Sequence, residues 1–221
     1  MSDAKSRFDA VSGVIFDLDG TVTDTLPIAY SAFRAAIAKF APREFTDAEL
    51  LQLSGPSEEG IFRQIVPDTW ELCFERYLEE YATGHGSCNE PFPGLIEVLD
   101  YLRERRLPRG LVTGKASRAV AITLRHIGVA HYFDPIEAGS PTGNIKVAAL
   151  RRVLARWRAS ASSVVYIGDV PSDMEAANAT GVIAVGAAWA AAVDPAALTG
   201  SGAHIVFSRV DDFLAWLRAR T

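Results

Sequence analysis

The chain has 221 residues, of which 49% are hydrophobic and 22% are charged, and its formal net charge is −5. This composition is typical of a globular protein built as one large domain or as a core with a smaller insertion, and the absence of a basic run argues against a nucleic-acid-binding surface. No apolar stretch is long enough to span a membrane, and no signal pattern begins the chain. The spacing of Cys73 and Cys88 is typical neither of a metal knuckle nor of a redox pair. We therefore expect a cytoplasmic protein.

Short apolar runs alternate with segments of helical periodicity along most of the chain. The runs that predict β-strands are residues 14–16, 110–112, 164–167 and 183–185. The segments that predict helices lie at about 95–102, 120–127, 150–157 and 172–180. Strands that alternate with helices in this way predict an α/β fold, with a doubly wound, Rossmann-like parallel sheet and helices on both of its faces.

Residues 26–82 differ, because they carry helical periodicity with no convincing strand between the helices. One apolar stripe covers residues 29–40, and a second, rich in aromatic residues, covers 70–81. Polar and glycine-containing segments at 23–27 and 83–89 bound this region and are typical of hinges, so it can act as a lid. The predicted division is a small all-helical cap at residues 25–89, inserted into a Rossmann-like core made of residues 1–24 and 90–221.

Two carboxylates stand one residue apart where the first predicted strand ends. Asp17 and Asp19 are followed at once by Gly20 and Thr21. Residues two apart on a strand face the same side, and ligands of α/β sheets bind at the carboxyl ends of the strands, so both acids can share one reaction centre. Two like charges held close together are unfavourable unless a cation or a proton relieves them. We therefore expect a divalent metal here.

The next predicted strand is followed by a hydroxyl and a turn, Thr113 and Gly114, which can donate hydrogen bonds to phosphoryl oxygens. Further along, the ammonium group of Lys146 can neutralise both Asp17 and a phosphate. Lys115 is the alternative for this role, since these two are the only lysines that fall in predicted core loops.

The strand predicted at 164–167 also ends in a glycine and an acid, Asp169, with Asp173 four residues further along. Carboxylate oxygens suit Mg²⁺ better than softer metals, and no cluster of histidine or cysteine offers another kind of site. Asp173 can also cap the helix that begins there.

Taken together, these segments resemble the four motifs of the haloacid dehalogenase superfamily, and the resemblance covers about residues 12–217. It implies that Asp17 is the nucleophile that accepts the phosphoryl group, and that Asp19 is the general acid and then the base. One departure is that Val147 follows Lys146, where many members have proline.

The resemblance also implies the rest of the site and its cofactor, Mg²⁺. The implied catalytic residues are Asp17, Asp19, Thr113 and Lys146. The implied substrate-binding residues are Gly20, Thr21, Gly114 and Lys115. The implied metal ligands are Asp17, Asp169 and the backbone carbonyl of Asp19, with Asp173 orienting a water on the ion.

Within the superfamily, halide-displacing and phosphonate-cleaving members lack the second acid, so Asp19 argues against both reactions. Sugar-phosphate mutases have both acids, but their lid usually carries a basic residue in a loop that corresponds here to 53–60, where Glu58 and Glu59 stand instead. We therefore expect a phosphatase of small phosphate monoesters, similar to phosphoglycolate phosphatases, although the acidic loop weakens the case for a doubly anionic substrate.

Two alternatives stay open, a mutase similar to β-phosphoglucomutase and a non-catalytic binding module of the same fold. The expected partner is a small phosphorylated metabolite, with no nucleic acid and no membrane, and the protein is expected to be a monomer or a homodimer. The candidates for cap residues that set specificity are Arg34, Arg43, Glu58 and Arg63.

Overall fold

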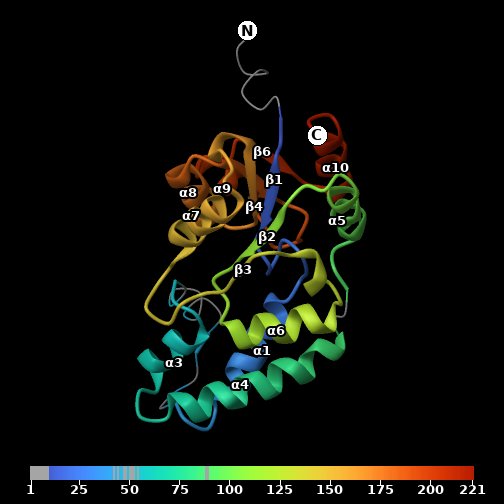
Figure 1. Ribbon diagram of the computed structural model, residues 1–221. Coiled ribbons are helices and arrows are strands. Elements are labelled where there is room, and N and C mark those ends of the chain that lie inside the picture. Colours follow the sequence, from blue (N-terminus) through green and yellow to red (C-terminus); the bar gives the residue numbers. More distant parts are fainter. Residues whose placement is uncertain are drawn as a thin grey trace.

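The centre of the molecule is a six-stranded, wholly parallel sheet (Figure 1). The computed structural model describes residues 10–41, 43, 45–46, 49, 53, 55–87 and 90–221. In sheet order the strands are β3 (Ile136–Glu137), β2 (Arg109–Val112), β1 (Gly13–Phe16), β4 (Val164–Gly168), β5 (Ile183–Ala187) and β6 (Ile205–Phe207). The predicted parallel sheet is confirmed. Strands β3 and β6 escaped prediction because two or three residues are too few to show an apolar pattern.

Side chains of β1 alternate between two apolar clusters, one on each face of the sheet. Val14 and Phe16 pack in the cluster that includes α5 (Leu95–Glu104) and α10 (Val210–Arg218). Ile15 packs on the other face, and the helices there are α7 (Lys146–Trp157), α8 (Pro171–Thr180) and α9 (Pro195–Gly200). Figure 1 shows these two helical layers on either side of the sheet. Burial of both faces is what makes the strands nearly continuous apolar runs.

The direction of strand addition reverses beside β1. The chain runs from β1 outward to β2 and β3, and then returns to the opposite side of β1 to form β4. In doubly wound sheets a crevice opens at such a switch point, outside the carboxyl ends of the strands. The acids at the ends of β1 and β4 flank this crevice.

A further helical layer covers the carboxyl ends of the strands (Figure 1). Its helices are α1 (Leu26–Ile37), α3 (Glu58–Ile65) and α4 (Trp70–Gly84). They share an aromatic cluster in which the rings of Phe33 and Phe62 stack with centroids 4.3 Å apart. The two predicted stripes are confirmed as α1 and α4, whereas α3 begins inside residues 53–60, for which the resemblance implies a loop.

This layer also packs on a helix that follows β2, α6 (Ser117–His126). Ala116 and Ala119 belong to the aromatic cluster, whereas Val120 and Leu124 belong to the cluster on the sheet. One helix therefore connects the two parts. The cap boundaries at 25 and 89 stay predictions, and Cys88 and Asn89 of the second hinge and Ser54 of the acidic loop lie outside the described residues.

The remaining short elements are 3₁₀ turns: η2 (His85–Ser87), η3 (Ala130–Tyr132) and η4 (Ala161–Ser163). The four helices predicted for the core are confirmed as α5, α6, α7 and α8. In the part of the chain that the structure describes, no helix combines the length and the hydropathy needed to cross a membrane.

Candidate active site

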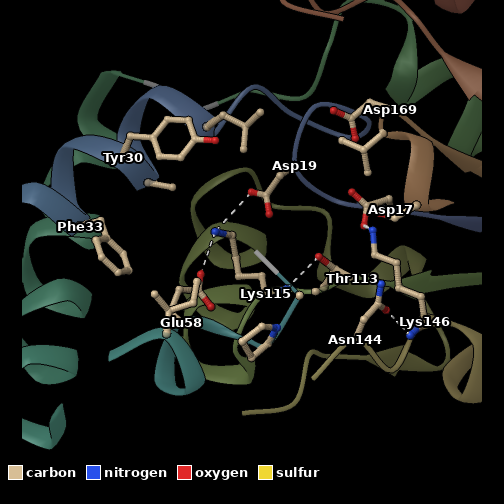
Figure 2. Close-up of a pocket in the computed structure, with 18 of the residues that line it drawn as sticks. Asp17, Asp19, Tyr30, Phe33, Glu58, Thr113, Lys115, Asn144, Lys146 and Asp169 are labelled. Carbon is tan, nitrogen blue, oxygen red and sulfur yellow. Dashed lines mark hydrogen bonds and ion pairs between the residues drawn. The ribbon is translucent and has the colours of Figure 1, made fainter. Parts of the chain in front are cut away.

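A cavity of about 480 Å³ lies between the carboxyl ends of the strands and the helical layer. That volume is in the range of small-molecule sites. The sheet side of its wall comes from the segments that follow β1, β2 and β4 and from the start of α7, and the opposite side comes from α1, α3 and α4 (Figure 2). The motifs that the sequence analysis selected thus meet in one place.

Three buried carboxylates gather at the sheet side of this cavity. One oxygen from each of Asp17, Asp169 and Asp173 lies within 4.8 Å of the other two. The single ammonium group of Lys146 faces them, with Nζ 3.2 Å from Oδ1 of Asp17 and 2.5 Å from Oδ1 of Asp173. Three acids against one base leave a buried excess of negative charge.

The pKa values report the cost of that excess. Burial raises the pKa of Asp17 from 3.8 to about 7, against the opposing effect of Lys146 and with the help of Asp173 and Asp19. Burial, then Asp17 and Asp173, raise the pKa of Asp169 from 3.8 to about 9. A divalent cation would relieve the same repulsion. The all-oxygen donor set fits Mg²⁺, as the sequence predicts.

Asp173 is held by several donors at once. Its Oδ1 accepts hydrogen bonds from Lys146 Nζ and, at 2.7 Å, from the hydroxyl of Tyr166, and its Oδ2 accepts one from the backbone amide of Val170 at 3.3 Å. A Cβ at Gly168 would lie 2.3 Å from Oδ2, so only glycine allows this approach. Asp173 therefore orients Lys146 and caps α8, and its predicted role toward a metal-bound water stays a prediction.

Asp19 lies between Asp17 and Lys115 in Figure 2 and belongs to a separate chain of contacts. Its carboxylate accepts a hydrogen bond from Thr25 and lies 3.4 Å from Nζ of Lys115. The same Nζ is 3.2 Å from Oε1 of Glu58, a residue of α3. The two candidate lysines are thus divided between the two acids of the first motif, and Lys146 is the one beside Asp17.

Thr113 and Gly114 line the cavity between these two groups of contacts. The hydroxyl of Thr113 accepts a hydrogen bond from the backbone amide of Lys115 at 3.3 Å, which fixes the turn after β2. The hydroxyl proton stays available for a phosphoryl oxygen.

Gly20 and Thr21 lie behind Asp169, and the cavity wall formed by the described residues does not include them. A Cβ at Gly20, where φ is +74°, would lie 2.1 Å from the Asp169 carboxylate, and the Thr21 hydroxyl lies 3.5 Å from Oδ1 of Asp169. The structure therefore places both residues where they pack against and orient Asp169. Their predicted contact with substrate stays a prediction.

Of the four cap residues proposed for specificity, Glu58 alone belongs to the wall that the described residues form. Arg43 pairs with Glu49 at 2.8 Å, and Arg63 lies over the ring of Trp70. Arg34 is exposed on α1. The three arginines therefore lie away from the cavity.

Sequence reasoning gave no role to three residues that the structure places in the site. Thr25 donates a hydrogen bond to Asp19, and Tyr166 donates one to Asp173. The side-chain oxygen of Asn144 accepts a hydrogen bond from the backbone amide of Lys146 at 2.9 Å. The sequence offered a signal for Tyr166, because it stands in an otherwise aliphatic strand and a buried phenol needs a hydrogen-bond partner. Thr25 and Asn144 carried no such signal.

Comparison with known proteins agrees with this geometry. The family described as "Haloacid dehalogenase-like hydrolase" matches residues 14–187, which include all of the motifs above. The chain belongs to the haloacid dehalogenase-like hydrolase family. The α/β fold and the prediction of an enzyme of the phosphatase type are thereby confirmed.

Individual proteins that are similar to this chain carry different names. A "Phosphoglycolate phosphatase" of Synechococcus elongatus is 30% identical over 182 residues, which are 81% of this chain and 84% of that protein. A "Tyrosine-protein kinase PtkA" of Mycobacterium tuberculosis is 30% identical over 189 residues, 84% of this chain and 65% of that protein. A solved structure of a predicted phosphatase from Clostridium acetobutylicum has the same fold, with a TM-score of 0.77 at 22% identity over 95% of this chain and 99% of that one.

The buried acids predict a pH-dependent effect of Mg²⁺ on stability. The pKa values of Asp17 and Asp169 are higher in the folded protein than in the unfolded chain. Without metal, the contribution of these two carboxyl groups to the free energy of unfolding is therefore fully present below about pH 4. It is lost as the pH rises through about 7 for Asp17 and about 9 for Asp169. Mg²⁺ should therefore raise Tm by several degrees at about pH 8 and much less at about pH 5, where protons hold its ligands. Thermal unfolding with Mg²⁺ or EDTA measures this, and an equal shift at both pH values would contradict it.

Proposed function

We propose that this chain is a Mg²⁺-dependent phosphatase that hydrolyses small phosphate monoesters through a phosphoryl group carried on Asp17. The observation that carries the proposal is the division of the first motif between two environments. Asp17 contacts Lys146 in the buried acid cluster, whereas Asp19 contacts Thr25 and Lys115. A nucleophile and a proton donor need such separate surroundings, because they perform opposite tasks.

In the first step, a carboxylate oxygen of Asp17 forms a bond to phosphorus while the bond from phosphorus to the ester oxygen breaks. Asp19 gives its proton to the departing oxygen, so that an alcohol leaves. In the second step, Asp19 takes a proton from water as the water oxygen attacks phosphorus and the bond to Asp17 breaks. Inorganic phosphate leaves, and both acids regain their starting states.

The other residues hold the phosphoryl group in place. Lys146 keeps Asp17 oriented and offers positive charge to a phosphoryl oxygen, and Thr113 offers a hydroxyl proton from the turn after β2. Asp17, Asp169 and the backbone carbonyl of Asp19 would hold Mg²⁺. When bound, the ion supplies charge that offsets the repulsion between the acids and the phosphate.

The test is phosphate release from a panel of esters, including phosphoglycolate, hexose phosphates and nucleotides, with Mg²⁺ and with EDTA. We expect release with Mg²⁺ and its loss with EDTA, because the buried acids would otherwise repel the phosphate dianion. Conversion of a hexose phosphate into its isomer without release of phosphate would favour a mutase. Binding of esters without any turnover would favour the binding module. The cytoplasmic location and the oligomeric state stay predictions.

A further inference from the structure

The wall of the cavity opposite Asp17 and Asp169 is largely apolar, with Glu58 as its charged residue among those described. Leu26, Ala29, Tyr30 and Phe33 of α1 and Ile61 of α3 line it. Figure 2 shows Tyr30 and Phe33 on this side, across from Asp17 and Lys146. A phosphoryl group bound at Asp17 would therefore direct its ester group toward hydrocarbon and aromatic surface.

Charged groups around the cavity leave no cation for a second anion. The described residues of the wall include four carboxylates, those of Asp17, Asp19, Glu58 and Asp169, and two ammonium groups, those of Lys115 and Lys146. Lys146 is committed to Asp17 and Asp173. Lys115 is the remaining cation on the side where the ester group would lie.

Lys115 already has a carboxylate partner from the helical layer. Its Nζ lies 3.2 Å from Oε1 of Glu58, which also accepts the hydroxyl of Tyr77 at 3.0 Å, and Oε2 accepts the amide of Ala116 at 2.6 Å. Three donors hold Glu58 in place, two from the turn between β2 and α6 and one from α4, and 11% of its side chain is exposed. Glu58 thus takes the position at which a substrate carboxylate would meet Lys115.

Burial would lower the pKa of Lys115, but Asp19, the two tyrosines and Glu58 outweigh it and raise that pKa well above its usual value. The ammonium group is therefore charged and fully paired. A further carboxylate beside it would face Glu58 and Asp19 with no free cation, which is the costly arrangement for a buried charge.

From the apolar wall and the Glu58–Lys115 pair, we infer that the substrate is a phosphate monoester with an uncharged, largely apolar ester group, and that Glu58 excludes esters carrying a carboxylate. This inference rests on the proposed phosphatase function and narrows its substrate class. It separates this chain from an enzyme that hydrolyses phosphoglycolate, whose ester group carries a carboxylate.

Benzyl phosphate and 4-carboxybenzyl phosphate form a matched pair, since their leaving alcohols are of similar acidity and differ by one remote charge. We expect kcat/KM with Mg²⁺ to favour benzyl phosphate by about tenfold or more, the effect of roughly one uncompensated charge near a partly buried site. The matching phosphonates, which cannot be hydrolysed, should show the same order of Kd by calorimetry. Equal values, or preference for the carboxylated compounds, would overturn the inference.

Two variants test whether Glu58 causes the preference for benzyl phosphate. Glu58→Gln keeps the shape and an oxygen acceptor but leaves Asp19 as the one carboxylate in contact with Lys115 among the described residues, so the preference for benzyl phosphate should fall to about threefold or less. Glu59→Gln removes the same charge one residue along α3, outside the described wall, and should keep the wild-type preference. An unchanged preference in Glu58→Gln, with Tm showing that the variant is folded, would remove Glu58 as its cause.

The two proposals fail in different ways. If the esters are hydrolysed without preference, the phosphatase function stands and the substrate inference falls. If no ester is hydrolysed but the phosphonate without a carboxylate binds more tightly, the catalytic proposal falls and the preference of the cavity stands.

Discussion

Replacing Asp17 with asparagine should reduce kcat by a factor on the order of 10⁴ or more, because an amide cannot accept a phosphoryl group and the remaining residues then have no covalent step to assist. The variant should nevertheless be more stable than the wild type in the absence of metal. Burial raises the pKa of the Asp17 carboxyl to about 7, so above that pH its negative charge opposes folding. Steady-state phosphate release and thermal unfolding in EDTA at about pH 8 measure the two effects.

The opposite signs of these two effects make the experiment decisive. An inactive but stabilised variant excludes unfolding as the cause of lost activity. Asp68→Asn removes the same charge at an exposed position between α3 and α4 and should change neither quantity appreciably. Asp17→Asn retaining a tenth or more of wild-type kcat would assign the phosphoryl group to another residue.

The second large effect should come from Lys146→Met, which keeps an unbranched side chain of similar length and removes its charge. Without the ammonium group, Asp17 and Asp173 lose their common partner inside the protein. Removing one partner of a buried ion pair typically costs about 3–5 kcal/mol, so we expect a reduced free energy of unfolding near neutral pH. We also expect kcat to fall on the order of 10²–10³-fold, as when one charge-stabilising donor is lost.

Two other lysines serve as comparisons for Lys146. Lys115→Met tests the alternative assignment, and it should impair turnover less than Lys146→Met because Lys115 contacts Asp19 and Glu58 but not Asp17. Lys39→Met removes a charge at an exposed position and should leave both stability and activity near wild type. A larger loss of kcat in Lys115→Met than in Lys146→Met would reverse the assignment of the two lysines.

The parts of the site that the sequence predicted are those fixed by local geometry. Asp17 and Asp169 each follow a buried strand directly, and parallel strands end at one edge of a sheet, so their convergence needs no long-range information. The helices that carry Phe33 and Phe74 could also be predicted from the sequence, because helical periodicity is a property of the segment itself.

Contacts that depend on the approach of distant segments could be resolved only in the tertiary structure. The sequence left Lys115 and Lys146 as rivals, since each occupies a core loop, and the folded chain separates them by placing one at Asp19 and the other at Asp17. Strand β3 forms because its backbone pairs with the edge of β2, and its own two residues are too few to show a strand pattern in the sequence.

By itself, the sequence of this protein determined the parallel sheet, the acids at its edge and the family, because strand ends and turn residues are set by neighbours along the chain. The tertiary structure alone decided that Glu58 reaches Lys115 and Ala116 from a helix 57 and 58 residues away, and that Gly20 and Thr21 lie behind Asp169. The contacts of Glu58 result from the packing of α3 and α4 with α6, and the contacts of Gly20 and Thr21 result from the pairing of β1 with β4. Packing depends on shape and burial across the whole molecule, which no local pattern encodes.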